Sequence, residues 1–265
     1  MRYQLSNLYD FDPAKHAMPD DQLAGLDRWI LGEFSKLEAE IMAAYDAYEF
    51  HVVYQKVSQF IAVELSSIYH DVIKDRLYTD PANSPRRRST QTALYRLVTG
   101  LCQMLAPILA FTVDEAWEFV PGKKVNSVHE SNWNFVAFSV SESEIEQWKY
   151  LLLARERILL PALELKRRDK TIGKSLDAKV QPTAEHFPEL VNNQELQDAL
   201  KELLNVSQLE FLSYDPHTDY TGKLVVHADG RKCGRCWHWE TDVGSNSDYP
   251  TICHRCVEAV KQHDG

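Results

Sequence analysis

The sequence predicts a mainly α-helical protein, in which a helical bundle is followed by a small α/β subdomain and a four-cysteine zinc knuckle. Three observations support this fold class. The 265 residues hold ten glycines, fewer than turn-rich β proteins use. Neither Gly nor Pro occurs between Glu33 and Asp80, where apolar residues recur every three or four positions. Four of the five cysteines lie in two Cys-x2-Cys pairs near the C-terminal end of the sequence.

The stretch without Gly or Pro is too long for one ordinary helix, so we predict two successive helices there. The earlier helix covers about 23–45, and its apolar face consists of Leu26, Trp29, Ile30, Phe34, Leu37 and Ile41. The later face consists of Val53, Val57, Phe60, Ile61, Leu65 and Ile68. The aromatic residues expected in the bundle core are Phe50, Tyr54, Phe60 and Tyr69.

A further helix is expected from Ser84 to Ala106. Ser84 caps the free amides and Pro85 suits the first helical position, while Pro107 ends or kinks the helix. Thr112 and Glu115 match a capping box that begins another helix before Pro121-Gly122. Residues 1–122 are therefore predicted to form an antiparallel helical bundle with short connections.

The rest of the sequence predicts a linker over 122–139, then a helix from Ser141 into a basic segment that ends near Lys174. Strands are expected over 176–180, 207–214 and 222–227, and a helix over 188–204. The predicted domains are thus 1–122, 123–220 and 221–265.

Charge and hydropathy restrict the function classes. No apolar run approaches the ~20 residues that cross a bilayer, and the N-terminal segment lacks a secretion signal, so we expect a cytoplasmic protein without a membrane partner. The net charge of −10 disfavours nucleic acid as a partner. Basic residues are nevertheless clustered, as Arg86, Arg87 and Arg88, as Lys166, Arg167, Arg168, Lys170 and Lys174, and as Arg231, Lys232, Arg235 and Arg255.

Each basic cluster has an ordinary explanation as a solvated surface. Arg86 to Arg88 are unusual because they occupy the first turn of a helix, where the helix dipole disfavours cations. Their position requires a compensating partner. Acidic neighbours are the favoured explanation and a phosphate ligand the alternative.

The cysteine pattern is C-x2-C-x16-C-x2-C, formed by Cys233, Cys236, Cys253 and Cys256. Two such turns supply four thiolates to one tetrahedral Zn²⁺ and leave no coordination position open, so the metal is expected to be structural. Residues 228–263 hold few aliphatic side chains, so metal binding would supply their folding energy. His238 and His254 are less favoured ligands, and Cys102 is expected in the helical core.

The knuckle also carries Arg235, Trp237, His238 and Trp239 on short loops. Aromatic faces stack on unpaired bases and basic groups supply charge, as in RNA-binding surfaces. Alternatively, the two tryptophans pack over the metal site, and we expect one tryptophan in each role. No catalytic motif accompanies them: Gly173-Lys174-Ser175 lacks the earlier glycine of a phosphate loop, and neither GxGxxG, GxSxG nor HExxH occurs. The residues alone therefore predict binding without catalysis.

In sequence order, these segments resemble the C-terminal part of the bacterial isoleucyl-tRNA synthetase family, which are class I aminoacyl-tRNA synthetases. The resemblance is carried by LDRWIL (26–31), YEFHVVYQKVSQF (48–60), ELSSIYHDVIKDRLYT (64–79), RRRSTQTALYRL (86–97), LAPILAFTVDEAWEFVPG (105–122), KTIGKSLDAKV (170–180) and CGRCWHW with CHRC. The helical segments are shared with the valyl and leucyl enzymes, whereas the cysteine cluster narrows the resemblance to the isoleucyl family.

The resemblance implies a helical anticodon-binding domain, one structural Zn²⁺ and the isoleucine tRNA as partner. The parent enzyme attaches isoleucine to tRNA with ATP and Mg²⁺ in a catalytic domain in cis, whose HIGH-like and KMSKS-like signatures are missing here. We therefore expect an inactive, monomeric fragment without catalytic residues. The resemblance places Arg235 and Trp237 at the anticodon loop. The full set of expected tRNA contacts is Arg235, Trp237, His238, Arg86, Arg87, Arg88, Arg167, Arg168, Lys170 and Lys174.

Two other functions remain open from the residues. One is a free-standing helical scaffold that binds protein through its zinc knuckle. The other is a DNA-repair glycosylase with a zinc ribbon, which is disfavoured because the N-terminal residues MRYQ lack the Pro-Glu pair such an enzyme requires.

Overall fold

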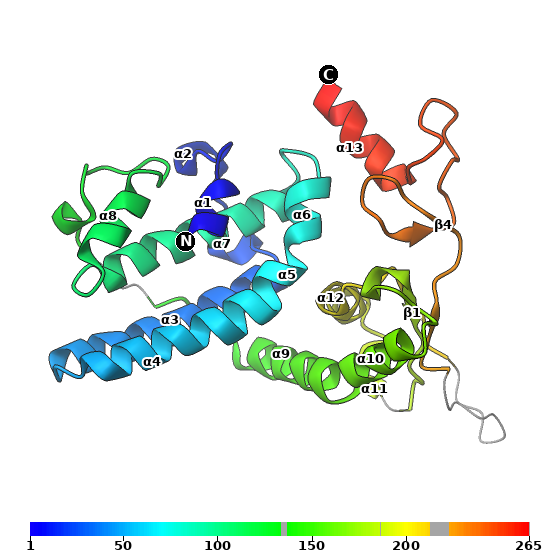
Figure 1. Ribbon diagram of the computed structural model, residues 1–265, viewed down its shortest axis with the longest axis horizontal. Coiled ribbons are helices and arrows are strands. Elements are labelled where there is room, and N and C mark those ends of the chain that lie inside the picture. The colour runs from blue at the N-terminus through cyan, green and yellow to red at the C-terminus, as the bar shows by residue number, and fades with distance from the viewer. Residues whose placement is uncertain (134–136, 186, 213–222, 265) are drawn as a thin grey trace. The chain divides into compact units, whose positions relative to one another are not determined.

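The computed structural model describes residues 1–265 except 134–136, 186, 213–222 and 265. The chain forms two compact units, Met1–Ser141 and Glu142–Gly265 (Figure 1). The predicted boundary near residue 220 lies outside the described residues. The three-domain division therefore stays a prediction.

The first unit is helical and contains no strand among its described residues. Its α-helices are α1 (Arg2–Ser6), α2 (Pro13–His16), α3 (Gly25–Asp46), α4 (Phe50–Phe60), α5 (His70–Val72), α6 (Lys74–Thr79), α7 (Pro85–Leu105) and α8 (Ala110–Trp117). Two 3-10 turns, η1 (Asp20–Gln22) and η3 (Val128–Glu130), and a π-helical segment, η2 (Ile61–Tyr69), complete it. None of the described helices is long and apolar enough to cross a membrane.

The core of this unit lies where α3 packs against α4 and α7 (Figure 1). All six residues of the predicted α3 face are buried, from Leu26 through Ile41. The three-to-four-residue spacing of apolar side chains therefore identified this helix and its inner face correctly.

The predicted inner face of the following segment is only partly correct. Val53, Val57 and Phe60 are buried in α4, but Ile61 is exposed. After Phe60 the helix is π-helical, so the next buried positions, Leu65 and then Tyr69, follow at intervals of five and four residues. A helix pattern of 3.6 residues per turn cannot anticipate this change of face.

Two of the four aromatic residues expected in the core are not there. Phe60 and Tyr69 are buried, whereas Phe50 and Tyr54 are exposed on α4. Phe50 lies at the start of the helix, where its ring meets Tyr45 edge to face. Aromatic character alone therefore did not distinguish the two faces of α4.

Helix α7 begins as predicted. The Ser84 side chain accepts a hydrogen bond from the Arg87 amide at 3.2 Å, and Pro85 is the first helical residue. The predicted capping box of Thr112 and Glu115 is wrong, because α8 begins at Ala110, after Leu109. The helix thus starts before the residues that were expected to cap it.

The segment predicted as a linker packs against the bundle in its described part. Trp133 donates its indole N–H to the Glu38 carboxylate at 3.0 Å, and the Phe138 amide donates to Ser35 at 3.0 Å. Together with η3, these contacts make residues after 122 part of the first unit.

The second unit combines helices with two small sheets. Its helices are α9 (Glu142–Ala154), α10 (Leu160–Arg168), α11 (Pro188–Val191), α12 (Gln194–Leu204) and α13 (His254–Asp264), with a π-helical segment η4 (Arg155–Leu159) and a 3-10 turn η5 (Ser175–Asp177). Its strands are β1 (Ala178–Val180), β2 (Gln208–Leu209), β3 (Val225–His227), β4 (Arg231–Lys232) and β5 (Trp239–Glu240). The predicted helix over 188–204 is interrupted, since Asn193 caps α12 by accepting from the Leu196 amide.

The first sheet has the order β2-β1-β3, with β1 parallel to β2 and antiparallel to β3. All three predicted strands therefore occur in their described parts, although residues 213–214 and 222 of those predictions lie outside the described residues. The second sheet pairs β4 with β5 antiparallel and holds the first cysteine pair. Gly230, at φ 88°, precedes β4, and a Cβ there would collide with the Glu240 carbonyl.

Candidate metal centre and nucleic-acid interface

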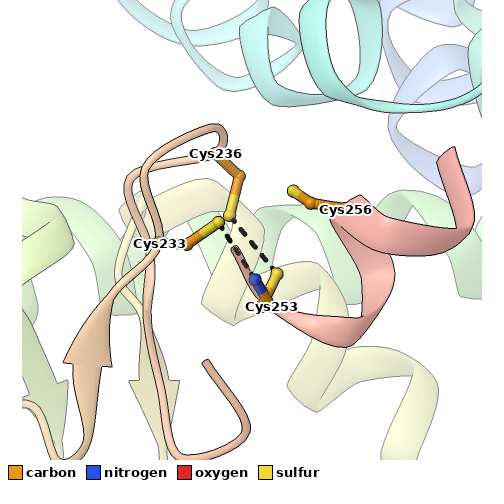
Figure 2. Close-up of side chains that lie close together, drawn as sticks. All are labelled: Cys233, Cys236, Cys253 and Cys256. Carbon is orange, nitrogen blue, oxygen red and sulfur yellow. Dashed lines mark hydrogen bonds between the residues drawn. The ribbon is translucent and has the colours of Figure 1, made fainter. Parts of the chain in front are cut away.

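The four cysteines of the knuckle come together at one point of the second unit (Figure 2). Cys233 and Cys236 lie on the turn between β4 and β5, whereas Cys253 and Cys256 lie at the start of α13. Their Sγ atoms all lie within 4.8 Å of one another, and all four residues are buried.

The donor set fits a tetrahedral zinc ion. Zn–S bonds of about 2.3 Å place neighbouring sulfurs of a tetrahedron about 3.8 Å apart. The Cys236 and Cys253 sulfurs are 3.8 Å apart. Four thiolates complete the coordination, so the ion is structural: it holds the knuckle and leaves no position for water or substrate. His238 and His254 are not part of this four-residue group.

Hydrogen-bond donors surround the sulfurs. The Cys253 amide donates to Cys233 Sγ at 3.3 Å, and the Arg235 guanidinium donates to Cys256 Sγ at 3.7 Å. These donors offset the negative charge of four thiolates around one divalent cation.

Trp237 and Trp239 have different environments although they are two residues apart. The Trp237 side chain is 55% exposed, and its backbone has φ 68°, a left-handed conformation that is rare for a bulky residue. Trp239 meets His227 edge to face at 4.5 Å, and its indole N–H donates to Asp177 at 2.9 Å. Trp239 is thus packed against the first sheet and Trp237 is displayed, while RNA contact by Trp237 stays a prediction.

The basic segment at the end of α10 lies in the same unit as the knuckle. Lys174 places its ammonium 5.5 Å from the centre of the Trp237 ring. Arg167 donates to Glu164 and to the Ser175 hydroxyl, and Arg168 pairs with Glu164 while its side chain stays largely exposed. Lys170 is exposed and has φ 63°. Of the predicted basic contacts, the structure thus brings Lys174 directly against the knuckle.

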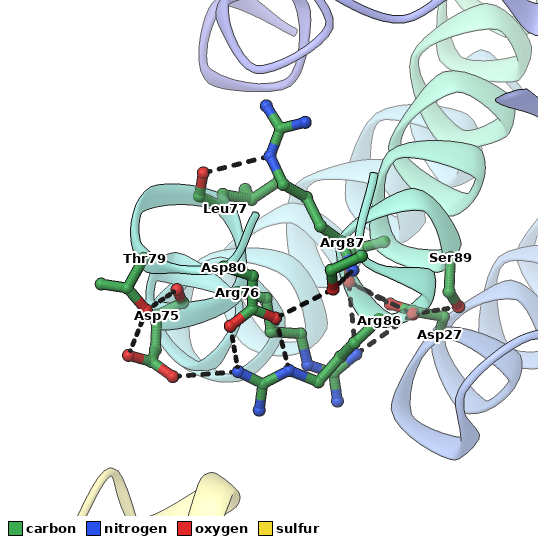
Figure 3. Close-up of polar contacts among 11 residues, drawn as sticks. Asp27, Asp75, Arg76, Leu77, Thr79, Asp80, Arg86, Arg87 and Ser89 are labelled. Atoms are coloured by element: carbon green, nitrogen blue, oxygen red, sulfur yellow. Dashed lines mark hydrogen bonds and ion pairs between the residues drawn. The ribbon is translucent and has the colours of Figure 1, made fainter. Parts of the chain in front are cut away.

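Arg86, Arg87 and Arg88 have acidic partners within the first unit. Arg86 bonds Asp80 at 2.8 Å and Asp75 at 3.2 Å (Figure 3). Arg87 forms an ion pair with Asp10 at 2.7 Å. The Arg87 side chain is 4% exposed and that of Arg88 10%. The favoured explanation for this cluster, acidic neighbours, is therefore confirmed. Phosphate contact by these arginines stays a prediction, and their burial gives it little support.

A second buried ion pair was not anticipated. Asp27, with no exposed surface, accepts from Ser89 at 2.6 Å and Arg76 at 3.1 Å (Figure 3). It also accepts from Tyr69 at 2.6 Å and from Thr90. These partners come from η2, α6 and α7, so one carboxylate joins several helices. Its only sequence signal was an acid on the apolar face of α3, beside Leu26 and Ile30.

The second carboxylate partner missed from the sequence is Asp10, which is only partly buried. It lies in the segment after α1 and binds Arg87 through both carboxylate oxygens. Its pKa is held below the ordinary value: burial alone would raise it, but hydrogen bonds from Arg87 and Gln91 outweigh that effect. Together with Asp75 and Asp80, it explains how cations are tolerated in the first turn of α7.

Two known sequence families match different parts of the chain. Residues 27–182 match the family described as the anticodon-binding domain of tRNA ligase. Residues 230–259, which hold all four cysteines, match a zinc finger found in FPG and IleRS. The zinc-finger match and the four-cysteine cluster agree on a structural zinc.

Curated relatives match nearly the whole chain. It is 41% identical over 266 residues to the isoleucine–tRNA ligase of Syntrophotalea carbinolica and 41% over 272 residues to that of Sodalis glossinidius, in each case over 98% of this chain. The enzyme of Moorella thermoacetica is 40% identical over 278 residues. The chain spans 29% of the length of these relatives. The chain belongs to the anticodon-binding-domain family of the tRNA ligases, and it corresponds to the part of the isoleucine–tRNA ligases that carries this domain and its zinc finger.

Proposed function

We propose that this chain binds the anticodon arm of an isoleucine tRNA, and that the zinc knuckle contacts unpaired bases of the anticodon loop. The family match supports anticodon binding. The relatives are named isoleucine–tRNA ligases, which supports an isoleucine tRNA as the partner. The geometry contributes a surface on which an aromatic ring and basic groups are displayed by a rigid metal-bound turn.

The observation that carries the proposal is the placement of Trp237. A large aromatic side chain that is more than half exposed forgoes burial energy, and its left-handed backbone adds strain. Zinc ligands on one side of it and β5 on the other fix this geometry. An exposed aromatic face held in place suits stacking on a splayed base, which is how proteins usually bind unpaired RNA.

The basic residues would have different roles around this ring. Arg235 donates to a zinc ligand, so it would serve the metal centre as well as RNA. His238, half-buried beside the ring, is a candidate for a base contact. Lys170 and Lys174 are exposed and would contact phosphates, and Arg167 and Arg168 would extend this basic strip. Arg86 to Arg88 would act within the bundle through Asp10, Asp75 and Asp80 more than on RNA.

The remaining parts of the proposal concern the whole protein. The parent enzyme would attach isoleucine to tRNA with ATP and Mg²⁺ in a catalytic domain in cis, in the cytoplasm and as a monomer. The present chain would have no catalytic site of its own. Gripping the anticodon arm would help position the distant acceptor end for that reaction.

The test is the affinity of the zinc-loaded chain for an isoleucine tRNA anticodon arm. Trp237→Ala should weaken binding by about 1–3 kcal/mol, because one stacking partner is lost. Zinc content should not change. The matched control is Phe111→Ala, which removes an even more exposed aromatic ring from α8 in the first unit. Equal affinity of the Trp237 variant and the wild type would contradict the proposal and favour the protein-binding scaffold.

A further inference from the structure

The loop between α10 and β1 is joined to the knuckle by one carboxylate. Asp177 Oδ1 accepts the Trp239 indole N–H at 2.9 Å. Its Oδ2 accepts the backbone amides of Gly173 at 3.1 Å and Lys174 at 2.9 Å. One side chain thus fixes both the backbone that carries Lys174 and the indole that anchors the knuckle.

The main chain around Asp177 strengthens this junction. The Asp177 carbonyl accepts the Ala228 amide at 2.8 Å, where β3 leads toward the knuckle. Ser207 donates to the Leu176 carbonyl and accepts the Trp239 amide at 2.8 Å. The loop, the first sheet and the knuckle are therefore held in one arrangement. Burial would raise the pKa of Asp177, but the hydrogen bonds from the Trp239 indole and from the Lys174 and Gly173 amides outweigh it and hold the pKa below its usual value.

The result of this arrangement is the contact between Lys174 and Trp237. The ammonium lies 5.5 Å from the ring centre, within the range of a cation–π interaction. Lys174 itself is exposed, and Trp237 keeps more than half of its surface accessible. A cation beside an exposed aromatic ring offers a positive charge to the phosphate of a single-stranded nucleotide and a stacking face to its base.

We propose that Lys174 and Trp237 form one nucleotide-binding subsite, in which Trp237 stacks on an unpaired RNA base and Lys174 contacts the adjoining phosphate, and that Asp177 is its positioning residue. This inference rests on the proposed function, which it deepens. Asp177 touches no RNA: it acts by holding the Lys174 backbone at a fixed distance from the knuckle. The competing explanation is that Lys174 merely shields the ring from water.

The experiment measures how the affinity of the zinc-loaded chain for the isoleucine tRNA anticodon arm depends on salt. Lys174→Ala should reduce the slope of log K against log salt by about 0.7, the loss of one phosphate contact on a single strand. Asp177→Asn, which keeps the shape but not the charge of the carboxylate, should reduce the slope in the same direction. The double variant should lose no more than Lys174→Ala, because Asp177 acts through Lys174.

Two matched controls separate this effect from general loss of charge. Lys149→Ala removes an exposed lysine of α9 that pairs with Glu146, and Asp229→Asn removes an exposed carboxylate that pairs with Lys179. Neither substitution should change the slope. Indole N–H resonances provide a readout without RNA: Lys174→Ala should shift that of Trp237, and Asp177→Asn should shift those of both Trp239 and Trp237.

The outcomes are distinct. A shift of the Trp239 resonance alone with an unchanged slope in Asp177→Asn overturns the positioning role. Unchanged slopes in both variants, while Trp237→Ala still weakens binding, overturn the subsite and leave the proposed function standing. No effect of Trp237→Ala overturns both. If Asp177→Asn loses zinc, Lys174→Ala decides, since an exposed lysine has no part in folding: an unchanged slope then overturns the subsite.

Discussion

The two units keep buried charge in opposite ways. In the first, the chain supplies both signs: Asp27 accepts from Arg76, Tyr69 and two hydroxyls, and no external group is needed. In the second, four thiols converge, and the single positive charge of the Arg235 guanidinium beside Cys256 cannot balance four thiolates. Negative charge gathered in this way needs a metal cation to be stable.

The apolar surroundings differ in the same way. The first unit buries long faces of α3, α4 and α7, whereas the buried cluster of the knuckle consists of the four cysteines and Val243, with Ile252 against it. Burial of this apolar core stabilises the bundle, and the bundle can therefore accommodate a buried polar centre. The knuckle has almost no core apart from its metal ligands. Metal removal should therefore destabilise the knuckle and leave the bundle of the first unit stable.

The largest effect is expected from removing zinc with a strong chelator. The knuckle should lose folding energy on the order of 10 kcal/mol, the scale of structural zinc in finger peptides, and unfold locally. Hydrogen exchange with metal analysis measures this: amides in 230–259 should lose protection, and those of α3 and α7 should keep it. Cys236→Ser should act like the chelator, and Cys102→Ala, in α7, should leave zinc bound. Persistent protection of the knuckle in metal-free protein would contradict this dependence.

The next effect concerns the polar centre of the bundle. Asp27→Asn should destabilise the first unit by about 3–5 kcal/mol, because Arg76 would remain buried without its counter-charge. The measurement is urea unfolding followed by a probe in the first unit, with zinc content as the check on the second. Asp71→Asn is the control, since its pair with Lys74 is exposed and contributes about 0.5 kcal/mol or less. A cost as small as that of the control would show that the Asp27 centre is not a source of stability.

A smaller effect is expected from acidification. The pKa of His70 is lowered from 6.5 to about 4, mainly by burial and further by the nearby amino group of Met1 and by Lys74. The unfolded state therefore binds the proton more readily, and stability should fall as pH decreases from about 6.5 to about 4. We expect a loss of about 2 kcal/mol, reduced from the full shift because the residue is partly exposed.

The check on this prediction is the pH dependence of the unfolding free energy in His70→Phe. Phenylalanine keeps a ring against Tyr3, which lies 4.6 Å away in the wild type, but it cannot titrate. The variant should therefore lose less stability than the wild type over the same pH range. Parallel pH curves for the two proteins would remove His70 from the account of acid sensitivity.

Much of this arrangement follows from local sequence patterns. The inner face of α3, the capped start of α7 and the four-thiol centre were all predicted, because helix periodicity, capping and ligand spacing are properties of neighbouring residues. The different exposure of Trp237 and Trp239 agrees with the expectation of different roles, although RNA contact by Trp237 stays a prediction. The acidic partners of Arg86 to Arg88 were expected in kind, although not which carboxylates they are.

The errors have physical causes beyond such patterns. The π-helical turn after Phe60 changed which residues face the core, so Ile61 was misplaced. Asp27, Asp10 and Asp177 were missed because each finds its partners through tertiary structure, at separations of 42 residues for Tyr69, 77 for Arg87 and 62 for Trp239. A carboxylate in a sequence gives no sign of which distant donors will surround it.

The left-handed backbone at Trp237 has a consequence for how this position can vary. Glycine and asparagine adopt that conformation most easily, so folding alone would favour them there. The proposed stacking contact requires a broad ring instead. Stability and recognition thus select different amino acids at one site, and substitutions that improve the first are expected to weaken the second.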